Sequence, residues 1–340
     1  PMAGRNGGNI VYNGEPEGIK QTDSITAKYL FALPKPVYRR KNIHDWFEIK
    51  EANVNNLKNV SVKIPKGVLS CITGVAGSGK STLIHQCFAK QHPETIIIDQ
   101  SPIGKSSRAN AVTYIGVFDL IRKAFADANQ TSASLFSFNS KGACAKCNGQ
   151  GMLSFELHFL DAVKTLCDEC EGKRYHADVL AYTYQGKNIA EVLDMTVNQA
   201  VDFFHTGKIK KLLEVLQEVG LGYLKLGQSL STLSGGESQR LKIANELKNS
   251  SNIYIMDEPT TGLHMSDIDN FYRIIKSLVD KDNTVIIIEH NLDIIKYADW
   301  IIDMGPGGGK DGGEVIFEGR PEDIIRFEVS YTGKYLGEVL

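Results

Sequence analysis

Two stretches of the sequence contain residues whose types and spacing suit the binding and cleavage of a nucleoside triphosphate. In the first, Gly74 is followed by four residues and then by Gly79, Lys80 and Ser81, before a helical pattern from Thr82. This GxxxxGKS order is typical of a loop whose backbone N–H groups surround phosphates, with lysine on the outer phosphates and the serine hydroxyl on magnesium. The predicted nucleotide-binding residues are Gly74, Val75, Ala76, Gly77, Ser78, Gly79, Lys80, Ser81 and Thr82.

The second stretch, Leu233 to Gly262, joins a helix start to a strand that ends in two acids. Ser234 and Glu237 have the spacing of a capping box, and the glycines between them leave backbone N–H groups open to phosphate. Asp257 and Glu258 follow the apolar run IYIM. We expect the first carboxylate to hold Mg²⁺ with the phosphate-loop serine, and the second to orient or deprotonate water. The predicted nucleotide contacts at the helix start are Ser234, Gly235, Gly236 and Glu237.

Two CxxC pairs indicate a metal site in the middle of the chain. Nineteen residues separate the pairs, which are Cys144 with Cys147 and Cys167 with Cys170. This spacing is typical of a four-thiolate zinc module, predicted here over 144–170. A redox role is disfavoured, because no thioredoxin-like βαβ pattern surrounds either pair. Four thiolates leave no open position, so the predicted Zn²⁺ is structural.

A basic region precedes and includes the first CxxC pair. Residues 101–150 carry six lysines and arginines against two acids, a local charge of +4. Basic and hydroxyl side chains bind phosphate oxygens, so this region could contact a nucleic-acid backbone. A solvated polar loop is the alternative. The candidate DNA-binding residues are Lys105, Ser106, Arg108, Lys141, Lys146 and Arg174.

The composition sets broader limits. A chain of 340 residues can hold two domains, and its 38 basic and 40 acidic residues give no global basic field. The longest apolar runs are too short to cross a bilayer, and the sequence begins without a secretory pattern, so we expect no membrane partner and a cytoplasmic location. Four of the six cysteines lie in the CxxC pairs, which favours metal over disulfides.

The elements that must position these residues predict an α/β fold. The phosphate loop follows one buried strand, TIIID at 95–99 is a second, IYIM a third, and TVIIIEH at 284–290 contains a fourth. We predict an ATPase core in two parts, 47–100 and 231–340, with residues 101–230 as an inserted mixed α+β domain. Thr196 and Gln199 form a second predicted capping box, which begins a helix of the insertion.

An internal repeat links the two ends of the sequence. PMAGRNGGNIVYNGEPEGI at 1–19 aligns with PGGGKDGGEVIFEGRPEDI at 306–324 at a constant offset of 305 residues. SITAKYL at 24–30 matches SYTGKYL at 330–336, one residue later in register. We therefore predict that residues 1–31 are the tail of a preceding, related cassette, which would make this chain the C-terminal half of a duplicated protein.

The repeated tail is predicted to fold as a β-hairpin and a small helix. Residues 32–46 contain two prolines and a basic run, and we expect a linker there. The hairpin could dock on a strand edge, or remain mobile and open to protease. Docking is favoured, because Ile10, Tyr12 and Tyr29 need cover.

The combination of motifs resembles the ABC-type ATPases. LSGGE at 233–237 and DEPTTGLH at 257–264 carry the resemblance, together with the phosphate loop. It implies that Gln100 senses the γ-phosphate and the attacking water, and that His290 is the switch histidine. With Lys80 and Glu258 these are the predicted catalytic residues. The resemblance also implies that a second cassette, as a homodimer or a tandem half, completes the ATP site.

A narrower resemblance is to the UvrA family of DNA-damage-recognition ATPases. Further segments that carry it are IDQSPIGKSSR, GKNIAEVLDMTV, GLGYLKLGQ, LSGGESQR and DWIIDMGPGGG. The resemblance covers nearly the whole chain and implies ATP, Mg²⁺ and Zn²⁺ as cofactors. It implies binding to duplex, damaged DNA in excision repair, with a UvrB-like helicase recruited through a segment that this chain lacks.

Three departures from the family pattern favour a divergent paralogue, such as those linked to resistance against DNA-damaging antibiotics. The region between the phosphate loop and Ile98 is short, Gly-Arg is missing before FSFN, and proline is missing after HFL. The alternatives are the ATPase subunit of a transporter or a chromosome-organising ATPase. The first gives no reason for a zinc module, and the second would need long heptad segments.

Overall fold

The computed structural model describes residues 9–31, 40–99, 103, 109–157, 160–205, 207–247 and 252–340. The chain divides into two compact units. The first unit consists of residues 1–101 and 246–340, and the second of residues 102–245. Within the described residues, no helix is long and apolar enough to span a membrane.

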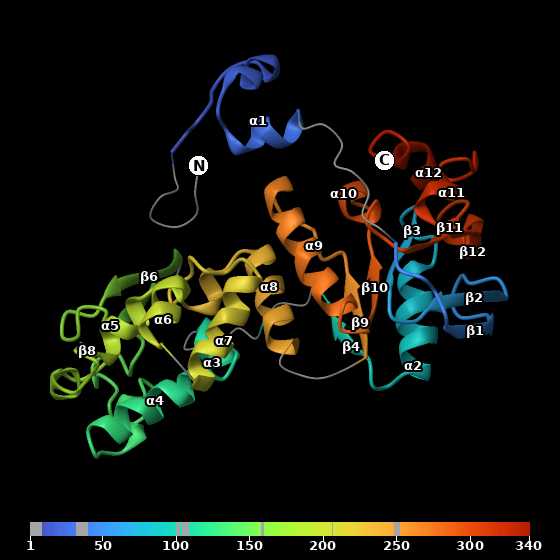
Figure 1. Cartoon of the computed structure of the whole chain (residues 1–340). Helices are drawn as coiled ribbons and strands as arrows, with labels where there is room; N and C mark the ends of the chain where they lie inside the picture. The colour runs from blue at the N-terminus through green and yellow to red at the C-terminus, as the bar shows by residue number, and fades with distance from the viewer. Residues whose placement is uncertain are drawn as a thin grey trace. The chain divides into compact units, whose positions relative to one another are not determined.

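A six-stranded sheet forms the centre of the first unit (Figure 1). Five of its strands are parallel and β12 is antiparallel to β11. Burial on both faces explains why the strand sequences are continuous β-branched runs, and every residue of TVIII in β10 is buried. In spatial order the strands are β12 (Glu314–Gly319), β11 (Trp300–Gly305), β3 (Leu69–Gly74), β10 (Thr284–Ile288), β9 (Ile253–Asp257) and β4 (Ile96–Ile98).

A second, two-stranded sheet packs against the same core. Strands β1 (Trp46–Ala52) and β2 (Val60–Pro65) are antiparallel, with a register shift between Ile49 and Ala52. The helical turns after the phosphate loop complete this core with buried leucine, isoleucine and phenylalanine. The remaining helices of the unit's body are η3 (Thr82–Phe88), α2 (Ala89–Gln91), α9 (Met265–Val279), α10 (Leu292–Ile295), η7 (Gly309–Asp311), α11 (Pro321–Ile324) and α12 (Tyr331–Leu336).

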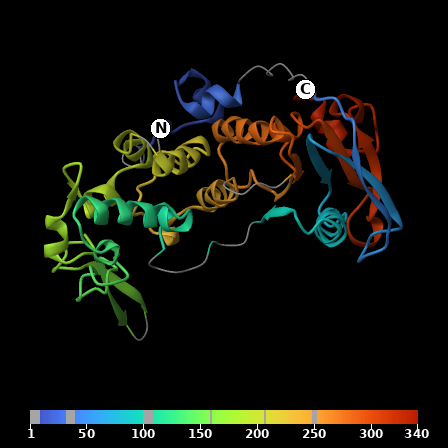
Figure 2. The ribbon, with the colours of Figure 1, turned by 60° about the horizontal axis from the view of Figure 1, so that its bottom comes forward.

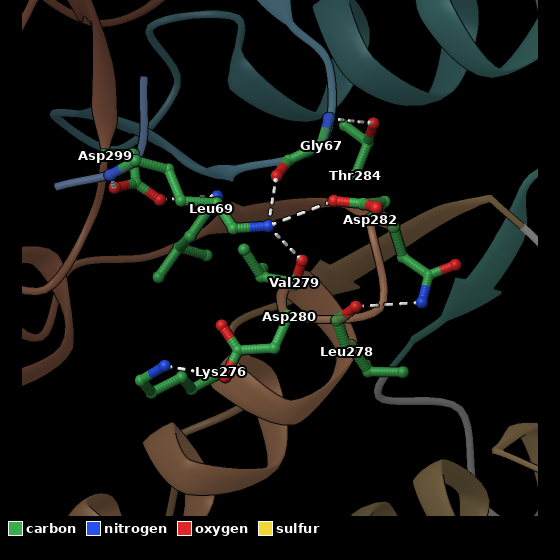
Figure 3. Close-up of polar contacts among 11 residues, drawn as sticks. Gly67, Leu69, Lys276, Leu278, Val279, Asp280, Asp282, Thr284 and Asp299 are labelled. Carbon is green, nitrogen blue, oxygen red and sulfur yellow. Dashed lines mark hydrogen bonds and ion pairs between the residues drawn. The ribbon is translucent and has the colours of Figure 1, made fainter. Parts of the chain in front are cut away.

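The starts of the strands, at the end of the sheet away from the phosphate loop, are tied together by polar contacts (Figure 3). The Lys41 ammonium donates to the carbonyl oxygens of Val279 and Gly67. Asp299 accepts from the backbone N–H groups of Lys41 and Leu69, at 2.9 and 3.1 Å. The linker therefore enters the cassette at a fixed point, because these bonds join it to β3 and to the end of α9.

The second unit is mainly helical around aromatic pairs. Phe118 stacks on Phe138 with ring centroids 4.9 Å apart, and Phe125 packs 5.2 Å from Phe136. The helices, in chain order, are α3 (Ala111–Tyr114), α4 (Val117–Ala128), η4 (Ala133–Phe136), η5 (Ala177–Ala181), α5 (Ile189–Asp194), α6 (Val197–Phe203), α7 (Gly207–Glu218), η6 (Leu230–Thr232) and α8 (Gly235–Glu246). Two short antiparallel pairs complete it, β5 (Met152–Leu157) with β6 (Leu160–Leu166) and β7 (Thr183–Tyr184) with β8 (Lys187–Asn188).

The predicted capping box before α6 is confirmed. The N–H of Thr196 donates to Gln199 Oε1 at 2.9 Å, and the N–H of Gln199 donates to Thr196 Oγ1 at 3.2 Å. Both contacts join residues three apart, so the sequence alone contains the information for them.

The predicted N-terminal hairpin is wrong for the part of it that is described. Residues 9–14 form no strand, and residues 9–31 contain the helices η2 (Pro16–Gln21) and α1 (Ile25–Leu30). In the C-terminal copy, β12 is held by pairing with β11. No segment of residues 9–31 matches β11, so the N-terminal copy of β12 has no such strand to pair with. Ile10 is accordingly 85% exposed.

The predicted small helix does form, and it contacts the body of the unit. Tyr29 donates its hydroxyl to Asp269 Oδ2 at 3.3 Å, and Thr26 Oγ1 lies 3.2 Å from His264 Nε2. Helix α1 therefore lies beside the start of α9, as the two views of the ribbon show (Figures 1 and 2).

Candidate nucleotide site and cysteine cluster

The phosphate loop leaves β3 at Gly74 and is organised around Lys80. The ammonium donates to the carbonyl oxygens of Gly74 at 2.9 Å and Val75 at 2.8 Å, and the residue is 6% exposed. Burial lowers the pKa of Lys80, while the charges of Glu258 and two aspartates act against that shift. The cation is thus held inside the loop, where phosphate oxygens would approach.

Position 74 requires glycine for two reasons, its backbone conformation and its close approach to the neighbouring strand. Its φ is +126°, and a Cβ there would lie 2.0 Å from the Met304 carbonyl oxygen. Gly79 has φ +107° and would place a Cβ 2.9 Å from the Leu57 side chain. No other residue satisfies both demands at Gly74, so the glycine spacing that identifies the loop in the sequence has a steric cause.

The two acids lie at the tip of β9, in the same sheet. Asp257 Oδ2 is 3.1 Å from His85 Nε2, which comes from the helix after the phosphate loop. Glu258 has φ +43° and donates its N–H to Ile288 O at 2.9 Å. This bond joins Glu258 to the end of β10, the strand that precedes His290.

His290 lies beside the second acid. Its Nε2 is 3.8 Å from Glu258 Oε1, and Thr261 Oγ1 is 3.4 Å from Glu258 Oε2. Four predicted residues, Lys80, Asp257, Glu258 and His290, thus come from the carboxyl ends of three neighbouring parallel strands. That end of an open α/β sheet is where such folds bind ligands. Gln100, the fifth, lies outside the described residues.

Glu289 and His85 are two residues of the site that the sequence analysis did not predict. Glu289 is buried and its carboxylate accepts from the N–H groups of Thr260 at 2.9 Å, His290 at 2.7 Å and Asn291 at 3.0 Å. It therefore joins the loop after Glu258 to the loop that carries His290. An acid directly after a buried strand was the signal for Glu289, whereas nothing in the sequence distinguishes His85 from an ordinary helical residue.

We expect Glu289→Gln to lower ATP turnover more than ATP binding, and to cost about 1–3 kcal/mol of stability. In the amide, an NH₂ group replaces one of the carboxylate oxygens that accept these hydrogen bonds. One backbone N–H would then have no acceptor. Thermal unfolding and kcat test this. Glu314→Gln, on an exposed carboxylate that pairs with Lys58, is the control and should change neither. Unchanged melting and kcat in Glu289→Gln would contradict the role.

The predicted capping box of the second unit's last helix is also confirmed. Ser234 donates its N–H to Glu237 Oε2 at 2.7 Å, and the Glu237 N–H donates to Ser234 Oγ at 3.3 Å. Tyr223 adds a hydroxyl bond of 2.6 Å to Glu237. Burial raises the pKa of Glu237, but these hydrogen bonds outweigh it and the pKa lies below its usual value. A carboxylate therefore sits beside the N-terminus of α8, with Gly235 and Gly236 in the first turn.

The four cysteines of the CxxC pairs form one buried cluster in the second unit. All four sulfur atoms lie within 4.8 Å of one another. Sγ of Cys144 is 3.9 Å from that of Cys167, and Sγ of Cys147 is 3.6 Å from that of Cys170. A tetrahedron of Zn–S bonds of about 2.3 Å has sulfur separations of about 3.8 Å, so the cluster fits zinc. The distances are far too long for disulfides, which need about 2.05 Å.

The surroundings of the cluster act on its thiols in opposite directions. The backbone N–H of Gly151 donates to Cys147 Sγ at 3.2 Å. A backbone hydrogen bond from Cys170 is the main cause that holds the pKa of Cys167 below its usual value, whereas burial raises the pKa of Cys144 and raises that of Cys170 to about 12.

The candidate DNA-binding residues differ in their contacts. Arg174 donates to Gly149 O at 2.8 Å and its guanidinium lies 3.7 Å from the Phe138 ring centroid. Lys146 pairs with Asp168 at 2.6 Å, and Lys141 is exposed. Lys105, Ser106 and Arg108 lie outside the described residues. Arg174 holds the cysteine module together, a role that the sequence analysis missed.

Comparison with known proteins identifies relatives of the whole chain. The family model described as ABC transporter matches residues 57–261. UvrABC system protein A of Aquifex aeolicus is 47% identical and that of Staphylococcus aureus 46%, each across all of this chain. The crystal structure of UvrA2 from Deinococcus radiodurans matches 99% of this chain with a TM-score of 0.92 and 42% identity. This chain spans only 41%, 40% and 45% of these three proteins.

Proposed function

Because the chain belongs to the ABC family of ATPases and is a homologue of UvrA, we propose that it binds and hydrolyses ATP and uses this cycle to control binding to duplex DNA. The process would be excision repair of damaged DNA or resistance to DNA-damaging agents. The convergence of Lys80, Asp257, Glu258 and His290 at one end of the sheet supports the hydrolytic part. The relatives named for the UvrABC system support the DNA part.

In the proposed reaction each residue has a defined task. Backbone N–H groups of the phosphate loop and the Lys80 ammonium bind the phosphates, while Ser81 and Asp257 hold Mg²⁺. The metal would supply charge neutralisation on the phosphate oxygens. Glu258 orients the attacking water and accepts its proton, and His290 and Gln100 position the γ-phosphate. Ser234 and the glycines after it, from a second ABC cassette, complete the site.

We propose that the second unit is an inserted signature domain with one structural Zn²⁺ held by Cys144, Cys147, Cys167 and Cys170. The sulfur separations and the buried position of the cluster support this assignment. The metal fixes two chain turns that would otherwise have only a small core, and it leaves no open position for catalysis.

We propose that this unit also carries the DNA-binding surface, with a UvrB-like helicase as a further partner of the complete system. Lys105, Ser106, Arg108 and Lys141 are the preferred phosphate contacts. Arg174 and Lys146 are weaker candidates, because each already has a partner within the module.

Lys105→Ala and Arg108→Ala should each weaken duplex binding for all sequences and reduce the salt slope by about one, because each would remove one phosphate contact. Fluorescence anisotropy across a range of salt concentrations measures both quantities. Lys58→Ala, which removes an exposed lysine of the first unit, is the matched control and should leave the slope unchanged. An unchanged slope in both test variants would show that these residues face away from DNA.

The ATPase subunit of a transporter is the second candidate, since the family model carries the description ABC transporter. The two proposals differ in their partner, a membrane complex in one case and a duplex in the other. Retention of the protein on duplex DNA, but not on membranes, would favour the repair-type function.

A further inference from the structure

Helices α1 and α12 are two copies of one short element. Their sequences, SITAKYL from Ser24 and SYTGKYL from Ser330, share Ser, Thr, Lys, Tyr and Leu at the same spacing. Each serine caps its helix, because its Oγ accepts the backbone N–H of the residue three positions later. The distance is 3.0 Å in α1 and 2.8 Å in α12. The repeat in the sequence is therefore a repeat in structure.

The N-terminal copy is docked on α9 through its tyrosine. Tyr29 donates to Asp269 Oδ2 and packs edge-on against His264, with ring centroids 6.4 Å apart. Leu30, the residue after Tyr29, is 52% exposed. We call His264–Asp269, at the start of α9, the docking site.

The C-terminal copy has the complementary pattern of burial. Its Leu336, the counterpart of Leu30, is fully buried against the cassette. Ser330 and Thr332 both donate to Asp303, a buried carboxylate that also accepts from Thr73 at 2.6 Å on β3. Helix α12 is thus anchored to its own sheet. The Thr332 hydroxyl is already bonded to Asp303. Of the two residues through which α1 contacts α9, Thr26 and Tyr29, only the counterpart of the tyrosine is therefore available on α12.

Tyr335, the counterpart of Tyr29, lies on the surface. It is 48% exposed, and its neighbour Tyr331 is 61% exposed. Exposed apolar side chains continue along the preceding segment, at Ile325, Phe327 and Val329. An apolar surface of this kind next to an anchored helix is typical of an interaction site.

We propose that Tyr335 and Tyr331 form a contact surface for the docking site of a second ABC cassette, as Tyr29 does for the docking site in this chain. The inference rests on the proposed pairing of two cassettes. Two homologous cassettes related by a two-fold axis contact each other through the same two surfaces. If the α12 helix of one cassette contacts α9 of the other, the α12 helix of the other therefore contacts α9 of the first. The pair would then be held by two tyrosine contacts.

This surface borders the nucleotide loops. A pocket of about 220 Å³ is lined by Tyr331, Thr332 and Tyr335 together with Gly74, Glu289 and His290. A partner that docks on α12 therefore covers the pocket beside His290. In a free copy of this chain, α1 occupies the docking site and competes with the α12 of a second copy.

The test measures self-association of the 340-residue chain by sedimentation, with Mg²⁺ and a non-hydrolysable ATP analogue. Tyr29→Ala weakens the competing α1 and should strengthen dimerisation by up to about 25-fold. This is about fivefold, the factor for about 1 kcal/mol of lost hydrogen bond, at each of the two docking sites. Adding Tyr335→Ala should weaken the dimer about tenfold or more, as expected for a buried interface tyrosine. Adding Asp269→Ala instead should weaken it similarly. Mixing the two double variants should restore part of the association, because one intact contact then remains.

Glu318→Gln in the Tyr29→Ala background is the control. Glu318 is exposed on β12, outside α12 and the apolar segment before it, so this change should leave the dimer intact. Failure of Tyr29→Ala to dimerise, or equal dimerisation with and without Tyr335, overturns the proposal. Binding of the ATP analogue is measured in parallel. A protein that binds the analogue but ignores Tyr335 contradicts only this inference, whereas absence of nucleotide binding contradicts the proposed function.

Discussion

Replacing Glu258 by Gln should leave ATP binding intact and lower turnover by about 10²-fold or more, the range expected when a general base is lost. The amide has nearly the same shape, so the N–H bond to Ile288 and the loop around it should persist. What disappears is the carboxylate that we propose as the proton acceptor for the attacking water. Steady-state kcat and the dissociation constant for ATP separate the two effects.

Glu318→Gln is the control for this prediction. Glu318 lies on β12 and is exposed, so its amide variant should keep wild-type kcat. Wild-type turnover in Glu258→Gln would assign the proton acceptor elsewhere, with Glu289 excluded because its oxygens are already taken by three backbone N–H groups.

Cys167→Ser should remove zinc from the protein and unfold the cysteine module. Zinc binding contributes about 10–16 kcal/mol in small zinc-dependent folds, so loss of one thiolate from this cluster should have a large local effect. The nucleotide loops belong to the other compact unit and should still bind ATP. Metal analysis, ATP binding and duplex binding measured on one preparation test all three consequences.

Cys87→Ser is the matched control, because Cys87 is a buried cysteine outside the cluster. The Cys87→Ser protein should keep one zinc per chain, even if the substitution disturbs packing in the first unit and lowers its stability. A wild-type protein without zinc after purification in reducing buffer would remove the zinc assignment, and an unchanged zinc content in Cys167→Ser would remove this ligand.

The sequence predicts well the features that depend on neighbouring residues. Both capping boxes, Ser234 with Glu237 and Thr196 with Gln199, join residues three apart and form as expected. The steric demand at Gly74 is likewise visible as a glycine spacing, although its cause, the Met304 carbonyl, lies 230 residues away.

Features that depend on distant partners could not be predicted in this way. A strand forms only where another strand pairs with it, so residues 9–14 share the sequence pattern of β12 without its structure. Arg174 has the composition of a phosphate contact, but its guanidinium packs on Phe138. The role of Glu289 as a link between two loops depends on the fold, which brings Thr260 and His290 beside its carboxylate.

The affinity of the purified chain for duplex DNA, measured with and without ATP, tests the account most directly. If the chain is a UvrA-like ATPase, it should bind duplex with a steep salt dependence, and its affinity should change when ATP and Mg²⁺ are added. Damaged duplex should be bound more tightly than undamaged duplex in at least one nucleotide state. A chain that hydrolyses ATP and binds no duplex in any nucleotide state would contradict the account and favour a transport-type ATPase.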